Sequence, residues 1–132
     1  MKERGVGRIL NVSSVTVKEP LANLILSNTM RTAVVSWAKS LSKEVAQFGI
    51  TVNTVLTGSF ETERIESLIK SQSQETGEDF EVLMKQKKQA IPAKRLGQPE
   101  EYGYLMAFLA SPFAGYINGA SIPIDGGALN CL

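Results

Sequence analysis

The sequence contains no histidine and only one cysteine, Cys131. Structural and catalytic zinc sites are built largely from histidine and cysteine, and Ser-His-Asp and Cys-His triads require an imidazole base. We therefore expect no metal site and no hydrolase triad of this kind. A single cysteine also has no disulfide partner within the chain, which favours a reducing compartment such as the cytoplasm.

An excess of one charge sign and long hydrophobic runs are also absent. Lys and Arg total 14 against 13 Asp and Glu, so the net charge of +1 offers no basic surface for nucleic acid or an anionic membrane. No stretch approaches the ~18 apolar residues of a membrane span, and the first residues lack the apolar core of a signal peptide. We expect a cytoplasmic protein without nucleic-acid or membrane partners.

The hydrophobic pattern of the 132 residues predicts one α/β domain, or part of one. Short apolar runs at Arg8–Ser13, Ile50–Leu56 and Ala120–Ile124 predict strands. Between the first two, residues 24–48 have a helical period that ends at Gly49. A strand, a helix and a strand in this order form a βαβ unit with parallel strands, so we expect a parallel sheet.

The long helix predicted over 24–48 carries an apolar stripe. Its members are Met30, Val34, Trp37, Leu41 and Val45. Residues at spacings of three and four share one helix face, so we interpret the stripe as core or as a subunit interface.

The segment 59–90 is a polar excursion between two predicted elements. Glu61–Lys70 and Phe80–Ala90 predict two short helices, separated by the polar stretch Ser71–Asp79. Such an excursion follows the carboxyl end of a strand, where open α/β sheets bind ligands. After it, Pro99 and two acidic residues predict the start of a further helix.

Several motifs follow one another in a fixed order: Gly7–Ser14, Gly49–Asn53, Gly58 with Thr62, Arg95–Glu101, Tyr116–Gly119 and Ile122–Gly127. Together they resemble the carboxy-terminal half of the short-chain dehydrogenase/reductase family, as an atypical member that resembles 3-oxoacyl-[acyl-carrier-protein] reductase-like proteins. The resemblance implies the second half of a Rossmann-type doubly wound parallel sheet, with 59–90 as the substrate-side lid. It also implies NAD or NADP as cofactor, a small-molecule carbonyl or alcohol substrate, and a homo-oligomer formed through the 24–48 helix.

The same resemblance implies the candidate site residues. Ser14 falls at the serine that hydrogen-bonds the substrate oxygen, while Gly58 and Thr62 fall in the cofactor-binding loop. The positions of the catalytic tyrosine and lysine hold Ser27 and Arg31. A serine hydroxyl is a weaker and shorter acid than a phenol, whereas Arg31 keeps a positive charge and donors for a ribose. The candidate catalytic residues are thus Ser14, Ser27 and Arg31, and Arg31 is also a candidate cofactor contact.

Each candidate has a structural alternative. Ser14 can be a loop serine that closes a strand, and Ser27 with Arg31 can be a helix-start serine and an exposed arginine. Thr62 can be the N-cap of a helix that begins near Glu63. Asn53 is interpreted as structural, satisfying backbone groups beside its strand.

A glycine-rich turn that would bind the cofactor's pyrophosphate is not found among the 132 residues, so we do not expect tight cofactor binding by this chain alone. Three hypotheses follow. The chain is a reductase domain that is active when an upstream half is supplied, or it is a non-catalytic remnant serving as an oligomerisation or interaction module. In the third, Ser14 is the sole donor, water supplies the proton and Arg31 stabilises the oxyanion.

Overall fold

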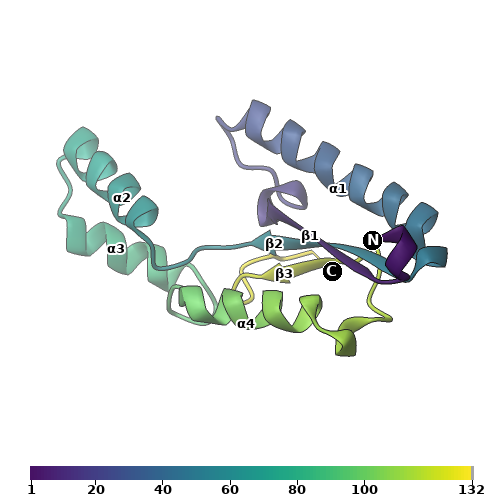
Figure 1. Cartoon of the computed structure of the whole chain (residues 1–132). Coiled ribbons are helices and arrows are strands. Elements are labelled where there is room, and N and C mark those ends of the chain that lie inside the picture. The colour runs from purple at the N-terminus through teal and green to yellow at the C-terminus, as the bar shows by residue number, and fades with distance from the viewer. Residues whose placement is uncertain (132) are drawn as a thin grey trace.

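A parallel sheet of three strands carries helices on both of its faces (Figure 1). The structure is a computed structural model that describes residues 1–131. The sheet has the order β1-β2-β3, with α1 on one face and α4 on the other, while α2 and α3 stand beyond the carboxyl ends of the strands. The bounds are β1 Gly7–Ser14, α1 Ile25–Val45, β2 Ile50–Thr57, α2 Glu63–Thr76, α3 Phe80–Gln89, α4 Pro99–Ala110 and β3 Ser121–Ile124.

The predicted α/β class and the predicted order of elements are confirmed. Boundaries differ by one to three residues at several ends, and most at the end of α2, since the helix predicted to end at Lys70 continues to Thr76. The residues added are mostly Gln, Ser and Glu, which a helix accommodates on a solvated face, and the helix stops at Gly77 with φ of 73°. None of the helices among residues 1–131 is both long and apolar enough to cross a membrane.

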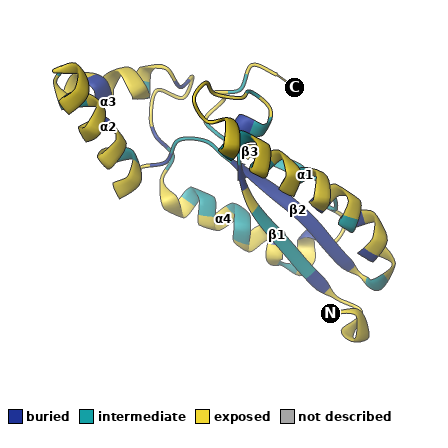
Figure 2. Ribbon diagram, turned by 90° about the horizontal axis from the view of Figure 1, so that it is seen from above, coloured by how far each residue is buried: buried dark blue, intermediate teal, exposed yellow. Residues whose placement is uncertain are grey.

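The core lies on both faces of β2, the central strand (Figure 2). Every residue of β2 except the last is buried, as expected for a parallel strand covered by helices on both sides. Side chains alternate between the two faces and so build two hydrophobic clusters. Toward α1 the buried members are Ala38, Val45, Ile50 and Val52; toward α4 they are Val55, Leu109 and Ala114.

The face of α1 that packs on the sheet coincides only in part with the predicted apolar stripe, of which Val45 is buried and Leu41 packs against the core. The buried residues of α1 are Ala38, Ser42 and Val45, two of which are small and allow the helix to lie close to β2. Met30 and Trp37 are 60% and 53% exposed. The interpretation of the stripe as core is therefore wrong for these two residues, and its interpretation as a subunit interface stays a prediction.

Two asparagines join β2 to the segment before β3. Asn53 Nδ2 donates to the carbonyl of Ile117 at 2.8 Å, and its Oδ1 accepts from the backbone N–H of Ala120 at 3.0 Å. Asn118 Oδ1 accepts from the backbone N–H of Val52 at 2.9 Å, while its Nδ2 donates to the carbonyl of Ser42. The predicted structural role of Asn53 is confirmed, because its amide satisfies backbone groups that the short β3 does not reach.

Candidate functional site

The carboxyl ends of the three strands form a row at one edge of the sheet. Ser14, the last residue of β1, is paired with Thr57 of β2, and Thr57 is paired with Ile124 of β3. This edge faces the α2–α3 hairpin (Figure 1). The register thus brings the predicted site residues Ser14 and Gly58 to neighbouring positions, at the edge where open parallel sheets bind ligands.

Ser14 caps the short 3-10 turn Val15–Val17 that follows β1. Its Oγ accepts a hydrogen bond from the backbone N–H of Thr16 at 3.2 Å. A hydroxyl that accepts in this way still has its own hydrogen to donate, and Ser14 Oγ donates to no group among residues 1–131. The structural role as a cap and a donor role toward a ligand are therefore compatible in the same side chain.

Ser27 and Arg31 share one face of α1 and are in contact. Arg31 Nε donates to Ser27 Oγ at 3.2 Å, and both residues are partly buried. The carbonyl of Arg31 accepts from Ser13 Oγ at 3.4 Å, which ties this turn of α1 to the end of β1. Within residues 1–131 no hydrogen bond joins Ser14 to Ser27 or Arg31. The structure therefore joins two of the three candidate catalytic residues directly and holds the third on the neighbouring strand end.

The guanidinium of Arg31 has donors to spare. Its Nε is used by Ser27, and in the described part of the chain no carboxylate lies within ion-pair distance of it. By contrast, Arg95 uses both terminal nitrogens on one carboxylate. Arg31 can therefore present a charged fork to a ribose or to an oxygen that gains negative charge.

Gly58 is required where the chain leaves β2. A side chain there would place its Cβ 2.6 Å from Cα of Asp125, and the N–H of Gly58 donates to the carbonyl of Ile124 at 3.0 Å. The hydroxyl of the preceding Thr57 donates to the phenol oxygen of Tyr102 at 3.3 Å, which connects this loop to α4. Tyr102 also packs edge-to-face on Phe60, with ring centroids 5.5 Å apart.

Thr62 is the N-cap residue of α2, which begins at Glu63 as predicted. Its hydroxyl does not cap the helix but donates to the carbonyl of Phe60 at 3.5 Å, and the side chain is exposed. The expected capping hydrogen bond is therefore absent, although the residue holds the N-cap position. A contact between Thr62 and a cofactor stays a prediction.

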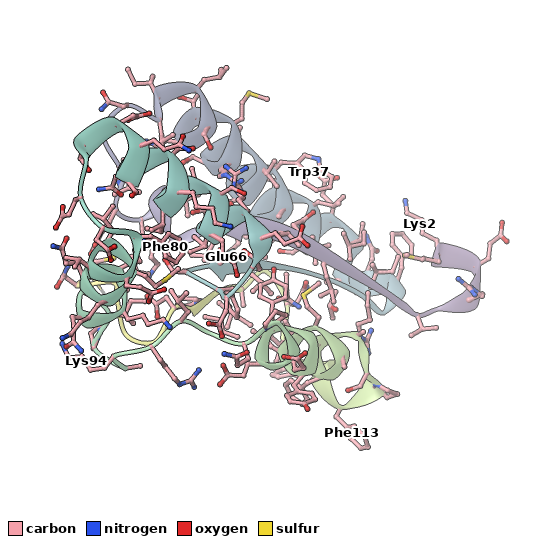
Figure 3. The ribbon with its side chains drawn as sticks, turned by 90° about the vertical axis from the view of Figure 1, so that its left-hand side faces the viewer. Lys2, Trp37, Glu66, Phe80, Lys94 and Phe113 are labelled. Carbon is pink, nitrogen blue, oxygen red and sulfur yellow. The ribbon has the colours of Figure 1, made fainter. Side chains whose placement is uncertain are left out.

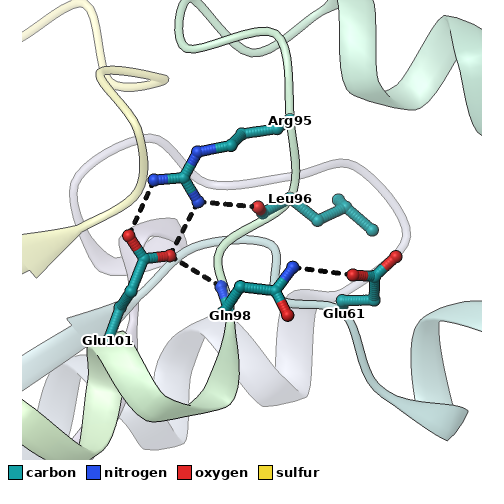
Figure 4. Close-up of polar contacts among 5 residues, drawn as sticks. All are labelled: Glu61, Arg95, Leu96, Gln98 and Glu101. Carbon is teal, nitrogen blue, oxygen red and sulfur yellow. Dashed lines mark hydrogen bonds and ion pairs between the residues drawn. The ribbon is translucent and has the colours of Figure 1, made fainter.

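A polar network that the sequence analysis did not assign joins the base of the α2–α3 hairpin to α4 (Figure 4). Arg95 binds Glu101 through two hydrogen bonds of 2.7 Å, and Glu101 also accepts from the backbone N–H of Gln98 at 2.7 Å. These donors lower the pKa of Glu101 to about 2, Arg95 first and the N–H of Gln98 second. Gln98 Nε2 in turn donates to Glu61 at 2.7 Å. The Gln98 to Glu101 spacing of a capping box is the signal that could have revealed the first part of this network.

A small cavity lies at the base of the α2–α3 hairpin, beside Arg95. Its volume is about 50 Å³, far below the roughly 300–1,000 Å³ of typical small-molecule sites. The candidate ligand edge among residues 1–131 is thus an open surface rather than an enclosed pocket. The cavity is lined by Ser59, Phe60, Ala93, Arg95, Gly97, Ile124, Asp125 and Gly126.

The fold and the row of strand ends belong to a known class of oxidoreductase. The family model described as Enoyl-(Acyl carrier protein) reductase matches residues 1–129. The chain belongs to this family of short-chain dehydrogenases/reductases and corresponds to the carboxy-terminal part of its Rossmann fold.

Individual relatives agree with this assignment. The NADPH-dependent reductase BacG of Bacillus subtilis is 34% identical over 132 residues, which is 100% of this chain and 51% of the relative. The oxidoreductase UcpA of Escherichia coli is 39% identical over 131 residues, 97% of this chain and 48% of the relative. The chain thus spans about half the length of the curated relatives it matches.

Solved structures give the same coverage. The crystal structure of YwfH, an NADPH-dependent reductase involved in bacilysin biosynthesis, matches with a TM-score of 0.92 and 34% identity, over 99% of this chain and 50% of that one. L-Sorbose reductase from Gluconobacter frateurii, complexed with NADPH and L-sorbose, matches with a TM-score of 0.92 and 29% identity, over 100% and 51%.

Proposed function

We propose that this chain forms the substrate-side half of an NAD(P)-dependent reductase that transfers hydride between the nicotinamide and a small carbonyl or alcohol compound. The observation that carries the proposal is the arrangement of Arg31 beside Ser27 on α1, tied through Ser13 to the strand end that bears Ser14. This keeps a charged donor and a hydroxyl at the edge where the family acts. NADPH in the names of two matched reductases supports the cofactor class.

The residues present fit one end of the cofactor and not the other. Arg31, with donors left for a ribose, and the backbone at Gly58 suit the nicotinamide-ribose end. No glycine-rich turn before a helix is available among residues 1–131 for the pyrophosphate. We therefore propose that the phosphate-binding part of the site is supplied from outside these 132 residues.

Part of the support for a complementing segment comes from β1. This strand lies at the edge of the sheet, and Nδ2 of its Asn11 is buried without a partner among residues 1–131. Buried polar groups are normally hydrogen-bonded, and an open strand edge favours pairing with a further strand. A strand added along β1 would pair with the backbone groups of this edge, and its side chains could supply an acceptor for Asn11.

The chemistry proposed for the chain's own residues follows from their acidity. When bound, the nicotinamide supplies or accepts the hydride. Ser14 donates a hydrogen bond to the substrate oxygen, and Arg31 stabilises the negative charge that develops there. Neither Ser27 nor Arg31 replaces a phenol as acid, so water delivers the proton in this scheme and turnover is slow compared with family members that carry the tyrosine.

A chimera tests the proposal. The upstream half of BacG is fused to residues 1–132, and NADPH binding and NADPH consumption are followed with a panel of small ketones. We expect binding and slow turnover. Arg31→Ala should reduce turnover by about 100-fold, because removing one preorganised donor to a developing oxyanion typically has an effect of this size. Arg4→Ala, at an exposed arginine outside the site, is the matched control.

A gain of activity sharpens the test. Ser27→Tyr combined with Arg31→Lys restores the family's residues at these positions and should raise turnover above that of the unsubstituted chimera. A folded chimera that binds no NADPH would refute the proposal. Binding without any turnover, even in the restored pair, would leave only a non-catalytic role.

A second candidate function is an oligomerisation module, and the outer face of α1 favours it. Ile25 and Leu26 are 81% and 77% exposed, and the apolar stripe continues along the helix through Met30 and Trp37. Exposed apolar surface of this extent is typical of an interface. We propose a second copy of the chain as the occupant, because one helix face can bury itself against its own symmetry mate.

Sedimentation velocity distinguishes this candidate. We expect a dimer, and we expect Trp37→Glu to give a monomer. Phe113→Glu is the control, since Phe113 is 89% exposed and lies on the opposite side of the molecule from Trp37 (Figure 3). A wild-type monomer at micromolar concentration, or dissociation by Phe113→Glu instead, would contradict an interface on α1.

A further inference from the structure

The segment Asp125–Cys131, here called the strap, runs from the end of β3 and is held at two distant loops. Its first anchor is the loop after α3, where the backbone N–H of Ala93 donates to the carbonyl of Gly126 at 3.1 Å. The fit there is close, because a Cβ at Gly126 would come within 2.9 Å of Ile91. The strap therefore starts firmly against the base of the α2–α3 hairpin.

The second anchor is Glu19, which is 111 residues away in sequence from Asn130. Glu19 Oε1 accepts from the backbone N–H groups of Asn130 at 2.7 Å and Cys131 at 3.0 Å, and Oε2 accepts from Asn130 Nδ2 at 3.4 Å. Between the anchors, Asp125 accepts from the backbone N–H groups of Gly127 and Leu129. Hydrogen bonds to a carboxylate are stronger than neutral ones, so two acidic side chains organise the backbone of the strap.

Glu19 lies in the loop between two candidate catalytic positions, Ser14 at the end of β1 and Ser27 in α1. The remaining ties of this loop are short-range: the N–H groups of Lys18 and Glu19 donate to the carbonyl of Val15, and Asn28 Nδ2 donates to the carbonyl of Leu21. The backbone N–H of Asn130 is the main reason that the pKa of Glu19 is lowered. The carboxylate is thus the loop's long-range polar connection among residues 1–131.

We propose that Glu19 is a positioning residue that couples the loop after Ser14, through the strap, to the loop at the base of the α2–α3 hairpin. These two loops border the strand ends where the substrate is proposed to bind. By fixing one loop against the other, Glu19 sets the position of Ser14 relative to the hairpin. The functional part of this inference rests on the proposed reductase activity; the coupling itself does not.

Hydrogen exchange followed by mass spectrometry tests the coupling in the 132-residue chain. Glu19→Ala should speed amide exchange about tenfold or more in residues 15–24 and in the strap, because local opening no longer breaks charge-assisted hydrogen bonds. Exchange in residues 91–97 should also rise, while β2 stays unchanged. Glu19→Gln keeps an Oε1 acceptor for both backbone donors and should restore most of the protection.

Two matched variants separate the coupling from a general loss of stability. Glu75→Ala removes an exposed carboxylate that has no side-chain partner among residues 1–131, and it should leave all three segments unchanged. A chain ending at Leu129 removes the donors and leaves Glu19 intact. It should reproduce the effect of Glu19→Ala on residues 15–24, and the combination of both changes should add nothing further. Unchanged exchange in Glu19→Ala, or additive effects, would overturn the proposal.

The chimera described above tests whether the position matters. Glu19→Ala should lower kcat/KM about tenfold, mainly through KM, and Glu19→Gln should recover most of it. Faster exchange in residues 15–24 with unchanged kinetics would refute the positioning role. If the chimera is inactive, the proposed function fails, and the exchange experiment still decides whether Glu19 couples the two loops.

Discussion

The body of the molecule and its α2–α3 hairpin are held together in different ways. In the body, Val52, Val55, Leu56 and Leu109 are completely buried around β2. In the hairpin, each helix buries a single side chain, Ile69 in α2 and Leu83 in α3. The body therefore rests on a shared hydrophobic core, whereas the hairpin has a small contact between its helices and is joined to the body at its base by the polar network and by the buried Phe60, Ile91 and Leu96.

This difference indicates which part of the molecule opens locally at low free energy. Regions with few buried apolar contacts and solvent-exposed hydrogen bonds open locally with low free energy, while core strands open only on global unfolding. The hairpin stands beside the candidate ligand edge, and each of its helices buries a single side chain. Local opening of the hairpin is therefore expected to cost less free energy than opening of the sheet.

The largest effect is expected from Leu109→Ala in the body. Leu109 is fully buried against Val55, and the truncation should lower the free energy of unfolding by about 2–5 kcal/mol. Urea denaturation measures this loss, and exchange should rise throughout the sheet. Tyr104→Ala, at a 73% exposed position of the same helix, should change stability by no more than about 0.5 kcal/mol. A small loss for Leu109→Ala would mean that the body is not a cooperative core.

A smaller and local effect is expected from Leu83→Ala in the hairpin. The side chain is 4% exposed and α3 packs mainly on α2, so a loss of about 1–3 kcal/mol should appear as faster exchange confined to residues 63–89. Val82→Ala, at a 45% exposed position next to it, is the control. Faster exchange in β2 as well would show that the hairpin and the body unfold together.

The smallest effect is expected at the polar base, and it depends on pH. The pKa of Glu101 is about 2 in the folded chain, against 4.5 for an unperturbed glutamate. The carboxylate therefore stabilises the fold fully above about pH 4.5, and this contribution is lost as the pH falls toward 2. Glu101→Gln should lower Tm by a few degrees near neutral pH and flatten the decline of Tm below pH 4.5. Circular dichroism measures both, and Glu100→Gln should leave the decline unchanged. An identical decline in the two variants would contradict the assignment.

The regular elements could be predicted because their signals are local. β-Branched runs marked the strands. Gly49 marked the end of the 3-10 turn Ala46–Phe48 that follows α1; its φ is 68°, and a side chain there would collide with the backbone of Gly5. The face of α1 could be predicted only in part from its apolar residues. Ala38 and Ser42 pack on the sheet because closeness to β2 favours small side chains, and periodicity of large residues does not report closeness.

In the candidate site, too, the contacts between residues close in sequence could be predicted, and the contacts between distant residues could not. The contact of Ser27 with Arg31 follows from their spacing of four on one helix, and the place of Ser14 follows from the end of its strand. The links of Glu19 to Asn130 and of Gln98 to Glu61 connect residues far apart in sequence. Nothing in one sequence indicates such pairs, because each partner taken alone is an ordinary exposed polar residue.

The hydrogen bonds that the side chain of Asn118 makes to Val52 and Ser42 are exposed to loss by deamidation. Hydrolysis of this side-chain amide would replace the Nδ2 donor by a carboxylate oxygen facing the carbonyl of Ser42, two acceptors where a hydrogen bond now joins them. Asn118 is followed by Gly119, a neighbour without a side chain to shield the amide, with φ of 70°. A stored sample that loses this one amide would lose the hydrogen bond from Asn118 to α1 and keep the one that Lys39 Nζ donates to the carbonyl of Gly119.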